Sequence, residues 1–174
     1  MLAKDDMVAI IDLKLVAYGN TQKSGNTYTC QHGEGECISD LYESCVEKEL
    51  AGSVENMFDA SIDAWPYILC MEQADGNPAK AESCYTSSMS NSSVTWSQVQ
   101  DCYDNDADEV MAKAAAATDE AHHTYVPWVV VDGSLLENTA LLQHAICSAY
   151  TGTKPESCVL GSRVPEGACL KENK

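Results

Sequence analysis

The sequence predicts an α/β fold that is rich in disulfides. A β-rich run lies near the start of the chain, a long helical region fills the middle, and a strand–turn–strand pattern followed by one helix closes it. Nine cysteines are distributed along the 174 residues. A chain of this length can bury a core of its own, and the sequence shows no internal repeat and no flexible linker. These observations favour one domain.

The first elements are a helix end, a strand and a loop. Residues 7–17, MVAIIDLKLVA, predict a helix end running into a strand, because IIDLKLV is β-rich and nearly continuous in apolar residues. Residues 18–37 are rich in Gly, Thr and Asn, and they predict a loop or a loose hairpin.

Helix start and stop signals then divide the middle of the chain. Asp40 and Glu43 have the spacing of a capping box and predict a helix that Gly52 ends. Ser53 is the expected cap of a second helix, which Pro66 should break or restart.

Three more helices are predicted before residue 120. Asn77-Pro78 is expected to open the first of them, and VTWSQVQDCY (94–103) predicts the next. Asp106 and Glu109 form a second capping-box pattern ahead of VMAKAAAA, which is the strongest helical signal of the chain.

The end of the chain changes character. YVPWVVVDGSLL (125–136) predicts two strands joined at Asp132-Gly133, a typical hairpin dipeptide. NTALLQHAICSAYTG predicts an amphipathic helix capped by Asn138 and ended by Gly152.

This order of elements is the one expected of a thioredoxin-like fold with a helical insertion between its two halves. We expect a single domain over residues 1–174. Its thioredoxin-like parts would cover about 7–22 and 124–152, a disulfide-stapled helical insertion about 30–120, and a Cys-bearing tail 153–174.

Charge and hydropathy limit the partners. The net charge of −17 repels phosphate backbones and anionic lipids, so we expect neither nucleic acid nor a membrane surface as a main partner. No apolar run approaches the roughly 18 residues of a membrane-spanning helix. The first residues do not resemble a secretory signal, since Asp5, Asp6 and Asp12 interrupt them, and we expect a mature chain or one whose leader has been removed.

The cysteine content indicates an oxidising compartment, so we expect a secreted or lumenal protein. Asn91-Ser92-Ser93 is a glycosylation sequon, which agrees with such a location. An odd number of cysteines leaves at least one thiol over or pairs it with a second chain, so a dimer is one expected outcome. The cysteines are Cys30, Cys37, Cys45, Cys70, Cys84, Cys102, Cys147, Cys158 and Cys169.

Residues 30–45, CQHGEGECISDLYESC, concentrate three cysteines and a histidine in sixteen positions. A zinc site is disfavoured because structural zinc ligands pair at C-x2-4-C spacing, whereas Cys30 and Cys37 are seven apart. A dithiol centre usually needs C-x-x-C, and this spacing occurs nowhere in the sequence. We therefore expect structural disulfides here, with no metal and no cofactor.

The same stretch resembles the signature of the gamma-interferon-inducible lysosomal thiol reductase (GILT) family, C-Q-H-G-x2-E-C-x2-N-x4-C. Seven of its eight fixed positions match, and position 40 has Asp in place of Asn. The resemblance continues through AYGN (17–20), CME (70–72) and YVPWVVVDG (125–133), so it covers most of the chain. The matching signature residues are Cys30, Gln31, His32, Gly33, Glu36, Cys37 and Cys45.

The resemblance implies thiol reductase activity, but the family's C-x-x-C belongs to a strand and helix start that precede the segment equivalent to IIDLKLVAYGN. This sequence begins near the end of that helix. We therefore expect a GILT-like protein without the catalytic dithiol, which is secreted or, as the resemblance implies, lies in the lysosomal lumen. It would bind other proteins, either host or foreign proteins that are secreted or on a surface, and would not reduce them. The alternative is a thiol reductase whose C-x-x-C segment lies outside this chain. Without the usual first strand, the sheet should close up or be completed by another segment or a second chain.

The resemblance also gives a meaning to Val126, Pro127 and Trp128. In thioredoxin-like folds the loop before the third strand carries a cis-proline that pairs with extended substrate backbone, so the resemblance implies a cis Val126–Pro127 bond. We expect either a peptide-binding loop that works by strand addition or a proline that only shapes the loop.

Overall fold

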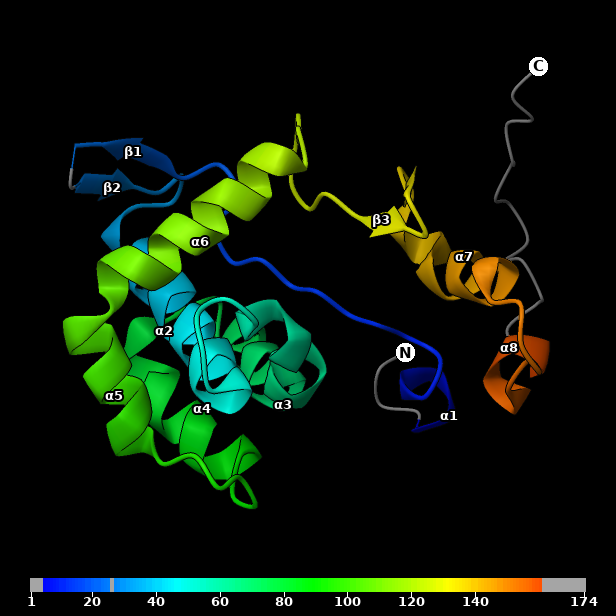
Figure 1. Ribbon diagram of the computed structural model, residues 1–174, viewed down its shortest axis with the longest axis horizontal. Coiled ribbons are helices and arrows are strands. Elements are labelled where there is room, and N and C mark those ends of the chain that lie inside the picture. The colour runs from blue at the N-terminus through cyan, green and yellow to red at the C-terminus, as the bar shows by residue number, and fades with distance from the viewer. Residues whose placement is uncertain (1–4, 26, 161–174) are drawn as a thin grey trace. The chain divides into compact units, whose positions relative to one another are not determined.

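The computed structural model describes residues 5–25 and 27–160, and it is mostly helical with two small hairpins (Figure 1). The strands are β1 (Gln22–Ser24), β2 (Thr27–Thr29), β3 (Val130–Val131) and β4 (Ser134–Leu135). The α-helices are α1 (Asp5–Val8), α2 (Glu34–Ala51), α3 (Ser61–Gln73), α4 (Ala81–Ser88), α5 (Trp96–Asn105), α6 (Ala107–Glu120), α7 (Leu142–Ala149) and α8 (Glu156–Leu160). Short 3-10 helices precede three of them: η1 (Met57–Ala60), η2 (Pro78–Lys80) and η3 (Thr139–Leu141).

The chain divides into two compact units. Residues 12–126 form the first, which we call the helical unit. Residues 1–11 and 127–174 belong to the second, which we call the terminal unit. The single GILT-like domain over residues 1–174, with its thioredoxin-like parts, helical insertion and tail, stays a prediction.

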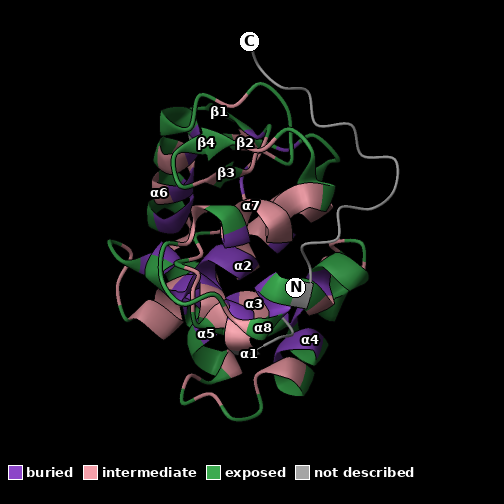
Figure 2. Cartoon of the chain, turned by 90° about the vertical axis from the view of Figure 1, so that its right-hand side faces the viewer, coloured by how far each residue is buried: buried purple, intermediate pink, exposed green. Residues whose placement is uncertain are grey.

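The helical unit is built around α2, which packs against η1, α3, α5 and α6. Its core is apolar, and the buried faces of α2 and α3 are visible in Figure 2. Tyr42 on α2 stacks on Tyr103 with ring centroids 4.3 Å apart, and the ring centroid of Trp96 lies 5.2 Å from that of Tyr42. The fully buried side chains include Cys45, Val46, Met57, Ala64, Tyr67, Met71, Val99, Cys102, Val110 and Ala114. Burial of this set is the main source of the unit's stability.

The terminal unit has a much smaller core. Met7 of α1 packs against the disulfide between Cys147 and Cys158. The carboxylate of Asp6 accepts hydrogen bonds from both the backbone N–H and the hydroxyl of Ser157, at 2.9 and 2.8 Å. These contacts join α1 to α8 within this unit.

Several local signals were interpreted correctly. The β3–β4 hairpin turns at Asp132-Gly133, and both residues have positive φ, as a type I′ turn requires. Residues 18–37 contain a loose hairpin, in which β1 pairs with β2. Asn77 caps η2 through the N–H of Ala79, and α2 ends at Gly52, which has φ 73°.

The two predicted capping boxes are wrong. Asp40 and Glu43 lie inside α2, which begins at Glu34 after Gly33. Asp106 does precede α6, but its side chain caps no backbone N–H and instead accepts from the ammonium of Lys48 at 2.8 Å. The ion pair with Lys48 thus takes the place of the predicted cap.

Pro66 does not break its helix, contrary to the prediction. It lies in the middle of α3, and its ring is exposed. The neighbouring Ala64 and Tyr67 are fully buried in the core. Burial on both sides of the proline therefore outweighs the backbone hydrogen bond that the proline cannot make.

The first predicted strand is also wrong. Residues 11–16 form no paired strand, although their burial alternates as in a strand: Ile11, Leu13 and Leu15 are half-buried, and the residues between them are exposed. The Leu15 N–H donates to the Ser61 hydroxyl of α3 at 2.9 Å. The alternation thus reflects packing on helices, and the described residues contain only two-stranded sheets.

Candidate functional site: the signature loop

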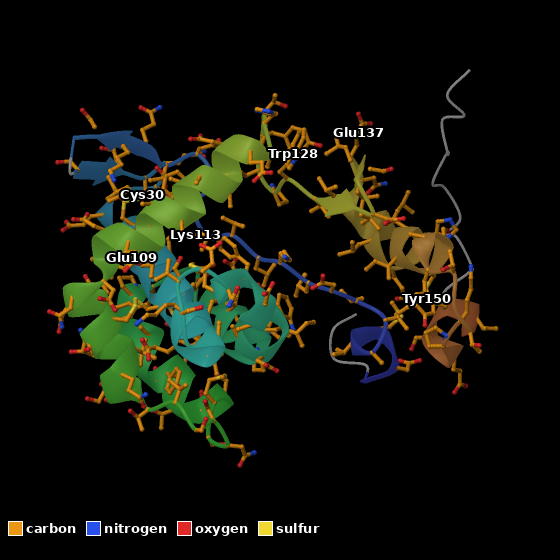
Figure 3. All side chains as sticks on the ribbon, in the orientation of Figure 1. Cys30, Glu109, Lys113, Trp128, Glu137 and Tyr150 are labelled. Carbon is orange, nitrogen blue, oxygen red and sulfur yellow. A yellow bond between two sulfur atoms is a disulfide. The ribbon has the colours of Figure 1, made fainter. Side chains whose placement is uncertain are left out.

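A disulfide closes the loop that joins the β1–β2 hairpin to α2. Cys30 follows β2, and its partner Cys37 lies in the first turns of α2, with 5.6 Å between their Cα atoms (Figure 3). Cys30 is buried, and the hydroxyl of Thr21 lies 3.1 Å from its sulfur. Gly33 lies in the turn between them with φ 97°, a backbone conformation that residues other than glycine rarely adopt.

Glu36 fastens the exposed part of this loop. Its Oε2 accepts the backbone N–H of His32 at 2.6 Å, and its Oε1 lies 3.1 Å from Nδ1 of the same residue. The carboxylate therefore bonds to the backbone and the ring of one residue together. This contact explains how Glu and His can be required at these two signature positions.

Gln31 joins the signature loop to two other segments of the helical unit. Its Oε1 accepts from the amide of Asn20 at 2.7 Å, and Asn20 Oδ1 lies 3.2 Å from Nε2 of His123. Asn20 belongs to the AYGN segment and His123 to the loop after α6. The structure thus brings together sequence features that are about a hundred residues apart.

The remaining described cysteines are also paired. Cys45, although it belongs to the signature, reaches across the core to Cys102 of α5. The other two pairs are Cys70–Cys84 and Cys147–Cys158. The disulfide-rich character of the fold is confirmed, and Cys169 lies outside the described residues.

One group of possible metal ligands occurs among the described residues: Glu49, Cys102 and Asp106. The sulfur of Cys102 is already bonded to Cys45, and Lys48 Nζ lies 2.6 Å from Glu49 and 2.8 Å from Asp106. One ammonium therefore pairs with both carboxylates. The group is therefore an ion-pair cluster next to a disulfide.

Comparison with known proteins agrees with the arrangement of this loop. A family model described as gamma interferon inducible lysosomal thiol reductase (GILT) matches residues 1–88, which include the whole signature. The chain belongs to the GILT family.

Two animal relatives named gamma-interferon-inducible lysosomal thiol reductase extend the similarity beyond the family match. The goldfish (Carassius auratus) protein is 32% identical over 87% of this chain and 61% of its own length. The mouse (Mus musculus) protein is 31% identical over 95% of the chain and 65% of its own length.

A plant relative is similar to the same extent. The Arabidopsis thaliana gamma-interferon-responsive lysosomal thiol protein is 31% identical over 88% of the chain and 63% of its own length. This GILT-family chain thus spans 61–65% of the length of the curated relatives it matches. Among the described residues, no helix has the length and apolarity to cross a membrane.

A row of acidic side chains on α2 was not recognised in the sequence as a unit. Asp40, Glu43 and Glu47 follow one face of the helix toward the core, and Glu43 and Glu47 are buried. Burial raises the pKa of Asp40 to about 7, helped by the charges of Glu36 and Glu72. The Asn of the family signature is always neutral at this position, and Asp40 with a raised pKa can be neutral too.

Glu43 and Glu47 are more strongly affected than Asp40. Burial raises the pKa of Glu43 well above its ordinary value, with Asp40, Glu72 and Glu47 adding to the effect, and burial raises that of Glu47 to about 8. The D-x-x-E spacing was taken for a cap. Its continuation to Glu47, seven residues after Asp40, was the signal for a shared helix face.

The remaining predicted site residues lie in loops. Val126 and Pro127 are exposed and Trp128 is half-buried, in the segment that runs into β3. Asn91 is exposed in the turn after α4, where a glycan would meet solvent. Their roles stay predictions.

Proposed function

We propose that this GILT-family chain is a secreted or lumenal protein that binds other proteins and does not itself reduce disulfides. Its partners would be secreted proteins or proteins on a surface. One observation carries the proposal: the eight described cysteines are all cross-linked, at sequence separations of 7 to 57 residues, and the sequence contains no C-x-x-C. Reduction of a substrate needs an attacking thiolate and a nearby thiol to resolve the mixed disulfide. Residues 1–174 offer no such neighbouring pair in their sequence.

The terminal unit has a surface suited to an extended peptide. An open hollow of about 340 Å³ lies between the β3–β4 hairpin and α7. Its lining is mostly apolar but includes three polar residues: Val131, Leu135, Leu136, Ala145 and Ala149, with Asp132, Ser134 and Ser148. Val130 of β3 is 51% exposed. Pro127 precedes this strand by three residues, so a bound strand beside β3 would pass the proline loop.

A second candidate function is disulfide reduction. The animal relatives are named thiol reductases, and this chain matches less than two thirds of their length. In this alternative a segment outside residues 1–174 supplies the C-x-x-C and completes a thioredoxin-like sheet. In that case the protein would work in the lysosome, which the names of those relatives give as their location.

An insulin reduction assay on the complete natural chain tests the main proposal, because a C-x-x-C outside residues 1–174 would be present in it. We expect turbidity from precipitating insulin chains to develop at the background rate of the reductant alone, because no dithiol can be regenerated. The mouse relative serves as the positive control. Turnover comparable to that control, abolished by alkylation, would overturn the binding-only function and favour the reductase.

Substitution of Pro127 tests the binding surface. Reduced and carboxymethylated lactalbumin is a suitable extended probe, and Pro127→Ala should weaken its binding about tenfold, or about 1.4 kcal/mol. Pro155→Ala, in the same unit but just before α8, is the matched control and should bind as the parent chain does. Unchanged affinity in a folded Pro127→Ala variant would remove Pro127 from the binding role and leave it as a loop-shaping residue.

A further inference from the structure

The hydroxyl of Ser61, at the start of α3, is the centre of a buried hydrogen-bond network in the helical unit. It accepts the backbone N–H of Leu15 at 2.9 Å. It also lies 2.5 Å from Glu47 Oε1 and 2.9 Å from the carbonyl of Phe58. Ser61 has no exposed surface, and Glu47 is 1% exposed. The network therefore joins the segment before the first hairpin to α2 and α3 with no direct access for water.

Counting hydrogens favours one protonation state of this network. A hydroxyl has one hydrogen and two lone pairs, Leu15 N–H can only donate, and the Phe58 carbonyl can only accept. An ionised Glu47 would compete with the carbonyl for the single hydrogen of Ser61. A neutral Glu47 donates to Ser61, which then donates to Phe58, and every contact of the hydroxyl has its hydrogen. The backbone N–H of Ser61 also donates to Phe58, so this carbonyl is bonded in either state.

The charges around Glu47 favour the neutral acid as well. Glu47 helps to raise the pKa of Glu43, one turn earlier on α2, so ionisation of both carboxyls together is disfavoured. The hydrogen bond from Ser61 lowers the pKa of Glu47, but burial has the larger effect. The lysines recorded in ion pairs on the surrounding segments bind other carboxylates. These pairs are Lys14 with exposed Asp59 of η1, Lys48 with Glu49 and Asp106, and Lys113 of α6 with Glu55. Burial without a cation therefore penalises the ionised form.

We propose that Glu47 is a proton-operated latch: as a neutral acid it completes the Ser61 network and holds residues 12–16 on the helical unit, and loss of its proton releases them. The proposal is independent of whether the protein binds or reduces its partners. When residues 12–16 detach, water reaches Glu47 and the carboxyl ionises as an ordinary glutamic acid does. The detached state therefore loses a proton that the docked state keeps.

This proton difference fixes how opening depends on pH. Where the docked acid is protonated and the detached one is not, the equilibrium constant for opening rises about tenfold per pH unit. The ordinary pKa of Glu47 is 4.5, and burial raises it to about 8 in the folded chain. The latch is accordingly tightest in an acidic lumen and loosens as the pH rises toward neutrality.

Hydrogen exchange of the Leu15 amide, followed by NMR on the whole chain, measures the latch. After correction for the intrinsic exchange rate, the protection factor should fall about tenfold per pH unit between about pH 5 and 7. The Val110 amide of α6, which is bonded to Asp106, reports unfolding of the whole unit in the same experiment. A pH-independent protection factor for Leu15 would overturn the proposal.

Glu47→Gln is the decisive variant, since its amide N–H donates to Ser61 whatever the pH. In this variant the protection factor of the Leu15 amide should no longer fall tenfold per pH unit, because the one proton released on opening is gone. Glu55→Gln, which removes an exposed carboxylate of the same unit, should leave the slope unchanged. An unchanged slope in a folded Glu47→Gln would also overturn the latch. If that variant does not fold, isotope-edited infrared spectra of the parent chain decide, because the absence of a protonated Glu47 carboxyl band at pH 6 would contradict the proposal.

Discussion

Removal of the Cys45–Cys102 disulfide, as the double variant Cys45→Ala/Cys102→Ala, is expected to lower the free energy of unfolding by about 4 kcal/mol. The bond closes a loop with a sequence separation of 57 residues and joins α2 to α5. Its loss would greatly increase the conformational freedom of the unfolded chain. Both cysteines are fully buried in the core, so the substitution also leaves unfilled volume there.

The signature disulfide provides the matched comparison. Cys30→Ala/Cys37→Ala removes a bond with a separation of only 7 residues, so its expected cost is about 2 kcal/mol. Urea denaturation without reductant, followed by far-UV circular dichroism, measures both variants against the parent chain. If the signature pair proved the costlier to remove, the Cys45–Cys102 bond would not be the main cross-link of the helical unit.

This difference between the two bonds also marks the limit of what the sequence could predict. The motif indicated that Cys30, Cys37 and Cys45 form disulfides, but eight cysteines allow 105 pairings. The partner of Cys45 is determined by the packing of α2 on α5, which no local pattern contains. The Asn77 cap and the Asp132-Gly133 turn were predicted correctly because each depends on two or three adjacent residues.

Two errors have the same physical origin. The spacing of Asp40 and Glu43 suits both a helix cap and a buried face of a helix, and only the tertiary structure distinguishes them. The alternation over residues 11–16 suits any segment with one side on a core, whether its neighbour is a strand or a helix. In both cases the local pattern did not determine which kind of element the segment packs against.

The buried carboxyls lead to the second large effect: the helical unit is expected to be more stable at pH 5 than at pH 7. The pKa of Glu47 is about 8 in the folded chain against an ordinary 4.5, and burial also raises the pKa values of Glu43 and Asp40. In this range the unfolded chain has released protons that the folded chain still holds. The stabilisation is complete below about pH 4.5 and is lost as the pH rises toward 8.

Each carboxyl of this kind contributes about 1.4 kcal/mol per pH unit, so Glu47 alone accounts for about 3 kcal/mol between pH 5 and 7. Urea denaturation at a series of pH values measures the trend. The double variant Glu43→Gln/Glu47→Gln should flatten it. Glu34→Gln/Glu55→Gln replaces the same number of carboxyls at two exposed positions of the same unit and should not. Stability that rises with pH in the parent chain would mean that these carboxyls are ionised in the folded state. The inference that the buried carboxyls of α2 are neutral would then be wrong.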